Sequence, residues 1–125
     1  MQTNFPPFQT KHFETNIDNL KTDIIYSVFE KRIFIWVSQT KSMGSIIYAE
    51  KDKLAEENLN VPTYSLTTLL GDRKRDQMYQ IMARQVIEQI SKNSNKALLL
   101  SIATKNMEIE HLRKVLQQIL KNKVW

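Results

Sequence analysis

The sequence predicts a single α+β domain in which a mostly antiparallel sheet of about six strands packs with two amphipathic helices. In the first half, β-branched and aromatic residues fill short segments, as is typical of strands. In the second half, apolar residues recur every three or four positions, as along one face of a helix. A length of 125 residues with 42% hydrophobic residues is enough for one core. We expect the domain to span residues 11–125, after an N-terminal arm at residues 1–10 in which Pro6 and Pro7 prevent a helix.

Five strands are expected before the first helix, over residues 11–17, 21–29, 31–39, 45–50 and 63–70. Glu30 and Lys31 mark the turn between the second and third strands. Gly44 marks the turn before the fourth strand and is free to adopt a positive φ there. Because the first four strands follow one another closely, we expect them to form an antiparallel meander. The charged segment 51–60 leads to the fifth strand and is interpreted as a loop.

A helix and a sixth strand come next in the predicted order. The helix spans residues 76–91, and Asp72 is its expected N-cap. Residues 97–103 form a nearly continuous apolar run, which indicates a central strand that is buried on both faces. One face of the helix carries the apolar residues Met78, Met82, Val86 and Ile90.

The last predicted element is a second amphipathic helix, which Asn106 is expected to cap with its side chain. We expect Trp125, close to the end of this helix, to pack inward. The predicted order is therefore β-β-β-β-β-α-β-α. The apolar stripe of the second helix consists of Ile109, Leu112, Leu116, Ile119 and Leu120.

The composition restricts where the protein works. The chain contains no cysteine, which excludes a disulfide framework and fits a reducing compartment. The apolar runs at residues 33–37 and 97–103 are much shorter than the roughly 20 residues of a membrane helix, and the first residues lack the form of a signal peptide. We therefore expect a protein of the cytoplasm or the nucleus that does not bind a membrane.

The residues needed for catalysis are not gathered in any recognisable motif. His12 and His111 are the only histidines, and they do not form a zinc-binding pair with HExxH spacing. With only Gly44 and Gly71, the chain cannot carry a P-loop or a dinucleotide-binding fingerprint. Glu110 and His111 are interpreted as an ordinary surface pair. We expect no catalytic residue, metal ligand or cofactor, and hence no enzyme.

The positive charge lies in the second half of the chain. The net charge is +5, and residues 63–125 contain eleven Lys and Arg against five Asp and Glu. A solvated helix face explains this excess most simply. The run from Arg73 to Arg75 opposes the dipole at the start of the first helix, so it does not stabilise the helix. It is interpreted either as a binding site for a phosphate or an acidic protein surface, or as a basic turn without a selected role. The alternative function is a nucleic-acid-binding module that uses Arg73, Lys74, Arg75, Arg113, Lys114 and Lys121.

Five segments, in this order and spacing, resemble one protein family. They are KTDIIYSVF with the apolar strand after it, SMGSIIYAE, LLG at residues 69–71, NKALLLSIATKN, and a C-terminal helix that ends in Val124 and Trp125. Together they resemble the proteasome assembly chaperone 3 family. The resemblance implies a non-enzymatic chaperone that pairs with a sister subunit, proteasome assembly chaperone 4. It also implies binding to α-type subunits while the proteasome α-ring forms, and release before the particle matures.

A dimer also follows from the sheet, because its edge strands need a cover. Pairing with the sister subunit is expected, and the isolated chain can pair with itself. Phe34, Trp36 and Tyr48 lie on predicted strands, where packing in the core or at a subunit interface is commoner than base stacking. Charged residues at two places are the predicted partner-binding residues: Lys51, Asp52, Lys53, Glu56 and Glu57 in the loop, and Arg73, Lys74 and Arg75 at the first helix.

Overall fold

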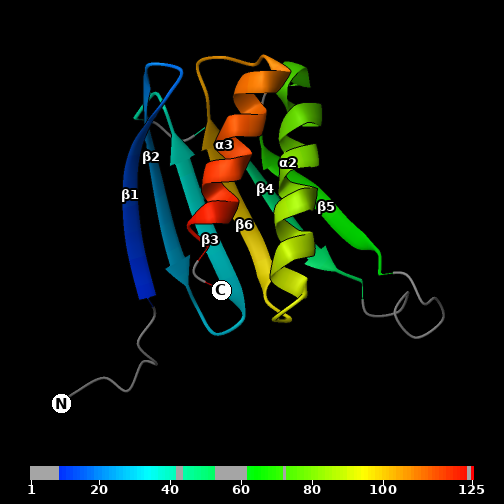
Figure 1. The fold of residues 1–125 in the computed structure, drawn as a ribbon. Coiled ribbons are helices and arrows are strands. Elements are labelled where there is room, and N and C mark those ends of the chain that lie inside the picture. Colours follow the sequence, from blue (N-terminus) through cyan, green and yellow to red (C-terminus); the bar gives the residue numbers. More distant parts are fainter. Residues whose placement is uncertain (1–8, 42–43, 53–61, 72, 124) are drawn as a thin grey trace.

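The computed structural model of the chain describes residues 9–41, 44–52, 62–71, 73–123 and 125, and has the predicted order of strands and helices (Figure 1). β1 begins at Gln9, inside the expected arm, and α2 begins at Arg73, three residues earlier than predicted. The strands are β1 (Gln9–Ile17), β2 (Leu20–Val28), β3 (Arg32–Ser38), β4 (Ser45–Lys51), β5 (Tyr64–Leu70) and β6 (Ala97–Ala103). The helices are α2 (Arg73–Ser91) and α3 (Ile109–Lys121).

The six strands form one sheet in the order β1-β2-β3-β6-β4-β5. All neighbours are antiparallel except β3 and β6, which are parallel. The predicted meander is therefore correct from β1 to β3 and wrong at β4, because β6 lies between β3 and β4. β6 is apolar on both faces, so burial is greatest when it lies in the middle of the sheet.

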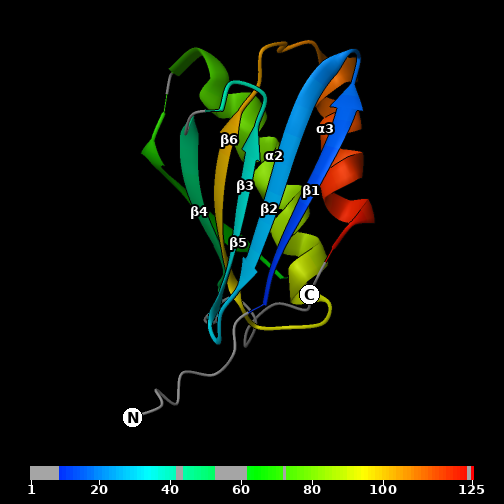
Figure 2. The same cartoon turned by 90° about the vertical axis from the view of Figure 1, so that its left-hand side faces the viewer.

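Both helices lie on the same face of the sheet (Figure 1), and no helix of the described chain lies on the other face (Figure 2). α2 packs on β4, β5 and β6, and α3 contacts α2 and β1. The core lies between the sheet and the helices. Its fully buried members include Ile24, Ile35, Ile47, Leu98, Leu100, Val86, Ile87, Val115 and Ile119.

The buried stripe of α3 differs in part from the predicted one. Leu112, Leu116 and Ile119 are buried as expected, and Val115 is buried as well. Ile109 was expected in this stripe but is 61% exposed, because the buried face is centred between Leu112 and Val115, about a quarter turn away from it.

The cap of α3 was also predicted wrongly. The N-cap residue is Glu108, which makes no side-chain cap bond. The Asn106 side chain accepts a hydrogen bond of 2.8 Å from the Glu108 N–H, so it orders the approach to the helix rather than the first turn. The predicted N-cap of the first helix, Asp72, lies outside the described residues.

Gly44 does not use the positive φ that is open to glycine. A Cβ atom at this position would overlap the carbonyl oxygen of Ile102, so the residue is glycine because the backbones approach closely. Positive φ values occur instead at Asp18 (51°) and Asn19 (66°), the two-residue turn of the β1–β2 hairpin. Such values are typical of the type I′ turns that fit the twist of paired strands.

Trp125 packs inward, as predicted. Its ring contacts Tyr26 at a centroid distance of 6.4 Å and adjoins the core. None of the described helices is long and apolar enough to cross a membrane.

Candidate interaction surfaces

The sheet face opposite the helices carries two rows of side chains that run across the central strands. The strand registers align Ile25, Trp36, Ser101 and Ile46 in the first row. The second row consists of Ser27, Phe34, Leu99, Tyr48 and Thr67. Because side chains alternate between the faces of a strand, these rows point away from the helices. We call their apolar members the open-face patch: Ile25, Phe34, Trp36, Ile46, Tyr48 and Leu99.

All six side chains of the open-face patch are half-buried, whereas their neighbours on the covered face are fully buried. The patch is continuous over β2, β3, β6 and β4 because its members are register partners or belong to adjacent rows. A contiguous apolar surface of this kind on a soluble domain marks a binding site more often than chance exposure does. The sequence signal was present in the segment IFIWV of β3, which is apolar on both faces.

Ser101 occupies the centre of the open face between Trp36 and Ile46. Its side chain is fully buried, and its hydroxyl has no hydrogen-bond partner within the described part of the chain. Besides the indole N–H of Trp36, this hydroxyl is the only polar side-chain group among the four residues of the row that contains Ile25. An apolar row is thus interrupted only by a small side chain that its neighbours cover.

The open-face patch ends at β1, where the side chains become polar. His12 Nε2 lies 3.0 Å from Asp23 Oδ1, and Lys21 forms an ion pair of 2.5 Å with Glu14. These pairs extend across β1 and β2. They separate the apolar surface from the β1 edge, so a partner that covers the patch meets a polar rim on this side.

The predicted partner-binding loop is described only at its start. Lys51 ends β4, and the carboxylate of Asp52 accepts hydrogen bonds from the hydroxyls of Thr63 (2.9 Å) and Ser65. Asp52 therefore closes the base of the β4–β5 connection. Lys53, Glu56 and Glu57 lie outside the described residues.

Arg73, Lys74 and Arg75 form the first turn of α2, where the basic run was expected. The Arg75 guanidinium donates to the carbonyl oxygen of Thr104 at 3.1 Å and lines a cavity of about 280 Å³. The seven residues of β5 separate this turn from Lys51 and Asp52, a distance of roughly 20 Å along the strand. The two groups of predicted residues therefore lie at opposite ends of the sheet.

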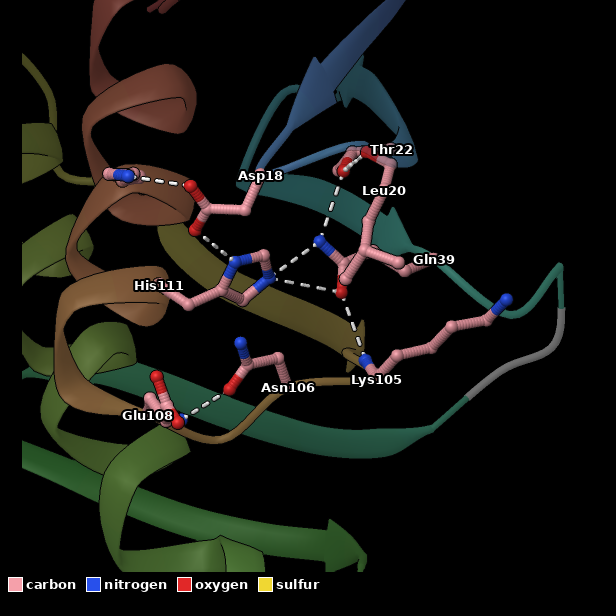
Figure 3. Close-up of polar contacts among 9 residues, drawn as sticks. Asp18, Leu20, Thr22, Gln39, Lys105, Asn106, Glu108 and His111 are labelled. Atoms are coloured by element: carbon pink, nitrogen blue, oxygen red, sulfur yellow. Dashed lines mark hydrogen bonds and ion pairs between the residues drawn. The ribbon is translucent and has the colours of Figure 1, made fainter.

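His111 was predicted to form a surface pair with Glu110. It is instead 1% exposed and enclosed by a polar network (Figure 3). Its Nδ1 lies 2.9 Å from Asp18 Oδ2, and its Nε2 lies 2.9 Å from Gln39 Nε2. Gln39 also donates to Thr22 and accepts from the Lys105 N–H. No local pattern predicts this network, because Asp18 and His111 are 93 positions apart.

The network joins the β1–β2 turn, the end of β3 and the start of α3. Asp18 Oδ1 accepts a hydrogen bond of 2.6 Å from the Lys114 ammonium, and this bond, with that of His111, lowers the pKa of the Asp18 carboxyl. An aspartate–histidine pair could orient a nucleophile, but the next group here is the amide of Gln39. The arrangement therefore fixes α3 on the sheet. The described residues contain no group of three potential metal ligands.

The basic residues of the nucleic-acid alternative are partly engaged within the protein. Arg113 pairs with Glu110 at 3.2 Å, Lys114 pairs with Asp18, and Arg75 binds the Thr104 carbonyl. Three of the four proposed cations whose side chains the structure describes thus have partners, so the described residues give no specific support to this alternative.

Comparisons with known proteins agree on one family. The family model for proteasome assembly chaperone 3 matches residues 35–122. Proteasome assembly chaperone 3 of Bos taurus is 23% identical over 121 residues, which cover 96% of this chain and 97% of the bovine protein. The Mus musculus protein of the same name is 25% identical over 105 residues, covering 83% of this chain and 84% of the mouse protein.

A solved structure has the same fold. It is a chain from the crystal structure of a chaperone complex for yeast 20S proteasome assembly, with a TM-score of 0.63 and 16% identity. The match covers 90% of this chain and 97% of the yeast chain. The matched family segment runs from β3 to the end of α3 and so includes most of the open-face patch. The chain belongs to the proteasome assembly chaperone 3 family.

Proposed function

We propose that this chain is a non-enzymatic chaperone that promotes assembly of the 20S proteasome α-ring as a dimer with a sister chaperone. The observation that carries the proposal is the open-face patch, an apolar surface within a chain of an assembly-chaperone family. A chaperone acts by covering surfaces, and this role needs no reactive group. The proposed sister subunit resembles proteasome assembly chaperone 4.

The open-face patch is the proposed site of the sister subunit. Two sheets that pack face to face bury side chains from both inner faces in a layer about 10 Å thick. Phe34, Trp36 and Tyr48 supply the aromatic area that dominates such interfaces. A second sheet placed here would bury the half-exposed rows that the helices leave uncovered.

The α-type subunits are proposed to bind elsewhere, at one or both ends of the sheet. β4 ends at Lys51 at one end, where the charged segment 51–60 begins, and the basic turn from Arg73 to Arg75 lies at the other. Because roughly 20 Å separates them, one subunit that touches both would have to extend along β5. The chaperone would hold an α-type subunit in a ring-competent position until later subunits displace it. We place this activity in the cytoplasm or nucleus.

The test is affinity purification of the tagged chain from its own cell extract, followed by mass spectrometry. We expect α-type proteasome subunits and a second small chaperone, without mature β subunits. A matched Trp36→Glu variant should lose the second chaperone, whereas Ile81→Glu, at an exposed position of α2, should retain it.

Two results would contradict the proposal. Recovery of neither α-type subunits nor a second chaperone would mean that the chain shares the family fold without this role. If the Trp36→Glu variant and the wild-type chain recover equal amounts of the second chaperone, the open face is not the pairing site.

A further inference from the structure

A groove of about 660 Å³ opens at the end of the sheet where β3 and β6 begin. Since these strands are parallel, Arg32 and Ala97 are register partners there, and both side chains project from the open face. Ala97 is small and leaves room between its larger neighbours. Tyr48, a member of the open-face patch, also lines the groove. The groove is therefore continuous with the apolar surface.

Basic side chains outnumber acidic ones in this groove. The hydroxyl of Tyr48 donates to Glu50 Oε2 at 3.2 Å, so one of the two carboxylates is already hydrogen-bonded. The ammonium of Lys96 contacts the carbonyl oxygen of Phe29 and is thereby held beside the β2–β3 turn. The charged residues that line the groove are Lys31, Arg32, Lys51 and Lys96, with Glu30 and Glu50.

The shape of the groove is fixed by backbone hydrogen bonds. The N–H of Ala97 donates to the Lys31 carbonyl oxygen at 3.0 Å, and the N–H of Phe29 donates to the Arg32 carbonyl oxygen at 2.8 Å. These bonds join the β2–β3 turn to the start of β6. The cations are therefore presented on an ordered scaffold, which reduces the entropy lost when a partner binds.

A second copy of this chain offers the groove little negative charge. On the described open face outside the groove, Glu14 is ion-paired with Lys21, and Asp23 Oδ1 lies 3.0 Å from His12 Nε2. Asp52 accepts hydrogen bonds from two hydroxyl groups. Outside the groove, these described carboxylates of the open face are thus already engaged, and within it four basic side chains face two acidic ones, so two copies that face each other would bring together two grooves with a basic excess. A partner with acidic side chains at this position has the complementary charge.

We propose that this charged groove receives Asp or Glu side chains of the sister subunit and thereby favours pairing with it over self-pairing. The inference rests on the proposed function, because it assumes that a sister subunit covers the open-face patch. Opposite charges at the rim of an interface accelerate association and disfavour wrong partners. The apolar patch would supply affinity, and the groove would supply the choice of partner.

The first test compares two charge-reversal variants in the affinity purification from cell extract. Arg32→Glu with Lys96→Glu alters the groove, and Lys11→Glu with Lys123→Glu makes the same charge change at exposed positions outside it. We expect the groove variant to retain about tenfold less of the second small chaperone. The control variant should retain a wild-type amount. Raising the salt from about 0.05 M to about 0.5 M should weaken wild-type pairing but not pairing of the groove variant.

The second test keeps the wild-type chain and so does not depend on how the variants fold. The purified pair is treated with a carbodiimide, which joins a lysine directly to a carboxylate in contact with it. We expect cross-links from Lys31, Lys51 or Lys96 to Asp or Glu residues of the second chaperone. Lys11 should form none.

The outcomes separate this inference from the proposed function. Full retention of the sister subunit by the groove variant, or a cross-linked pair without groove lysines, would overturn the inference and leave the proposed function intact. If the wild-type chain retains no second chaperone, the proposed function fails and the inference fails with it. If the groove variant loses the sister subunit while the control variant retains it, and groove lysines are cross-linked, the results support both the inference and the proposed function.

Discussion

The two faces of the sheet are built from the same strands but meet different surroundings. On the covered face, Ile35 and Leu100 are fully buried by the two helices. On the open face, Trp36 and Leu99 alternate with them and stay half-buried. β3 and β6 are apolar on both faces, although the helices of the described residues cover only one of them. The covered face maintains the fold, and the difference supports the proposal that the open face serves a partner.

The largest change in the free energy of unfolding should come from a substitution on the covered face. Replacing Leu100 by alanine removes a fully buried side chain and leaves a cavity beneath the helices. We expect the free energy of unfolding to fall by about 2–5 kcal/mol, measured by urea denaturation. A loss below about 1 kcal/mol would mean that this face is not the core on which the comparison depends.

A substitution on the open face should weaken partner binding more than it lowers the free energy of unfolding. Trp36→Glu should weaken binding to the sister chaperone by about 2 kcal/mol or more, which corresponds to roughly thirtyfold in Kd. The unfolding free energy of the isolated chain should change less than in Leu100→Ala, because Trp36 is only half-buried. Titration of the purified variant with the sister subunit measures the first quantity, and urea denaturation the second. Strong destabilisation with unchanged binding would reverse the roles of the two faces.

A hydrogen bond between the sheet and α3 should contribute less. The buried hydroxyl of Tyr26 donates to the Ile119 carbonyl oxygen at 2.6 Å. Tyr26→Phe leaves this carbonyl without its partner, so we expect a loss of about 1–3 kcal/mol in unfolding free energy. Binding to the sister chaperone should not change, since Tyr26 belongs to the covered face. Weaker binding at unchanged stability would contradict this assignment.

The Asp18 carboxyl should make stability depend on acidity. Its pKa is lowered from 3.8 by the Lys114 and His111 hydrogen bonds, so it binds a proton more weakly in the folded chain than in the unfolded chain. This contribution is fully present above pH 3.8 and is lost as the pH falls through the lowered pKa.

Denaturation of the wild-type chain and Asp18→Asn at several pH values measures this effect. Asparagine also tolerates the positive φ of this position, which makes it a matched replacement. The wild-type chain should be the more stable at neutral pH, and the difference should shrink in acid. A difference that stays constant to below pH 3 would exclude the carboxylate as its source.

The smallest effect is expected at Ser101. Its hydroxyl has no partner among the described residues, so Ser101→Ala should leave the unfolding free energy within about 0.5 kcal/mol or raise it slightly. Sister binding should be unchanged or stronger, because the substitution removes a hydroxyl without a described partner from this row. Weaker binding would show that the hydroxyl finds a hydrogen-bond partner across the interface.

Local patterns predicted the elements but not all of their neighbours. Alternation along KTDIIYSV and the apolar spacing along α2 depend on nearby residues and can be read from the sequence. The insertion of β6 between β3 and β4 depends on how the whole sheet is buried. The meander was predicted only because the first four strands follow one another closely along the chain. It is correct only for β1 to β3.

The candidate sites could likewise be predicted only where they depend on local sequence patterns. Phe34, Trp36 and Tyr48 were assigned to a core or an interface because their strands are aromatic and β-branched, and the strand registers then place them on one face. The burial of His111 could not be predicted, because it depends on the turn residue Asp18, distant in sequence. The partner-binding residues in the 51–60 segment and at Arg73 to Arg75 remain predictions.

The most direct test of the open face uses the absence of cysteine from the chain. A single cysteine is introduced in place of Ile46, and its rate of maleimide labelling is measured alone and with the sister chaperone. Ile81→Cys on α2 serves as the control, since Ile81 is exposed. We expect the sister chaperone to protect the cysteine at position 46 and not the one at position 81. Equal labelling at position 46 with and without a bound sister chaperone would contradict the claim that it covers the open face.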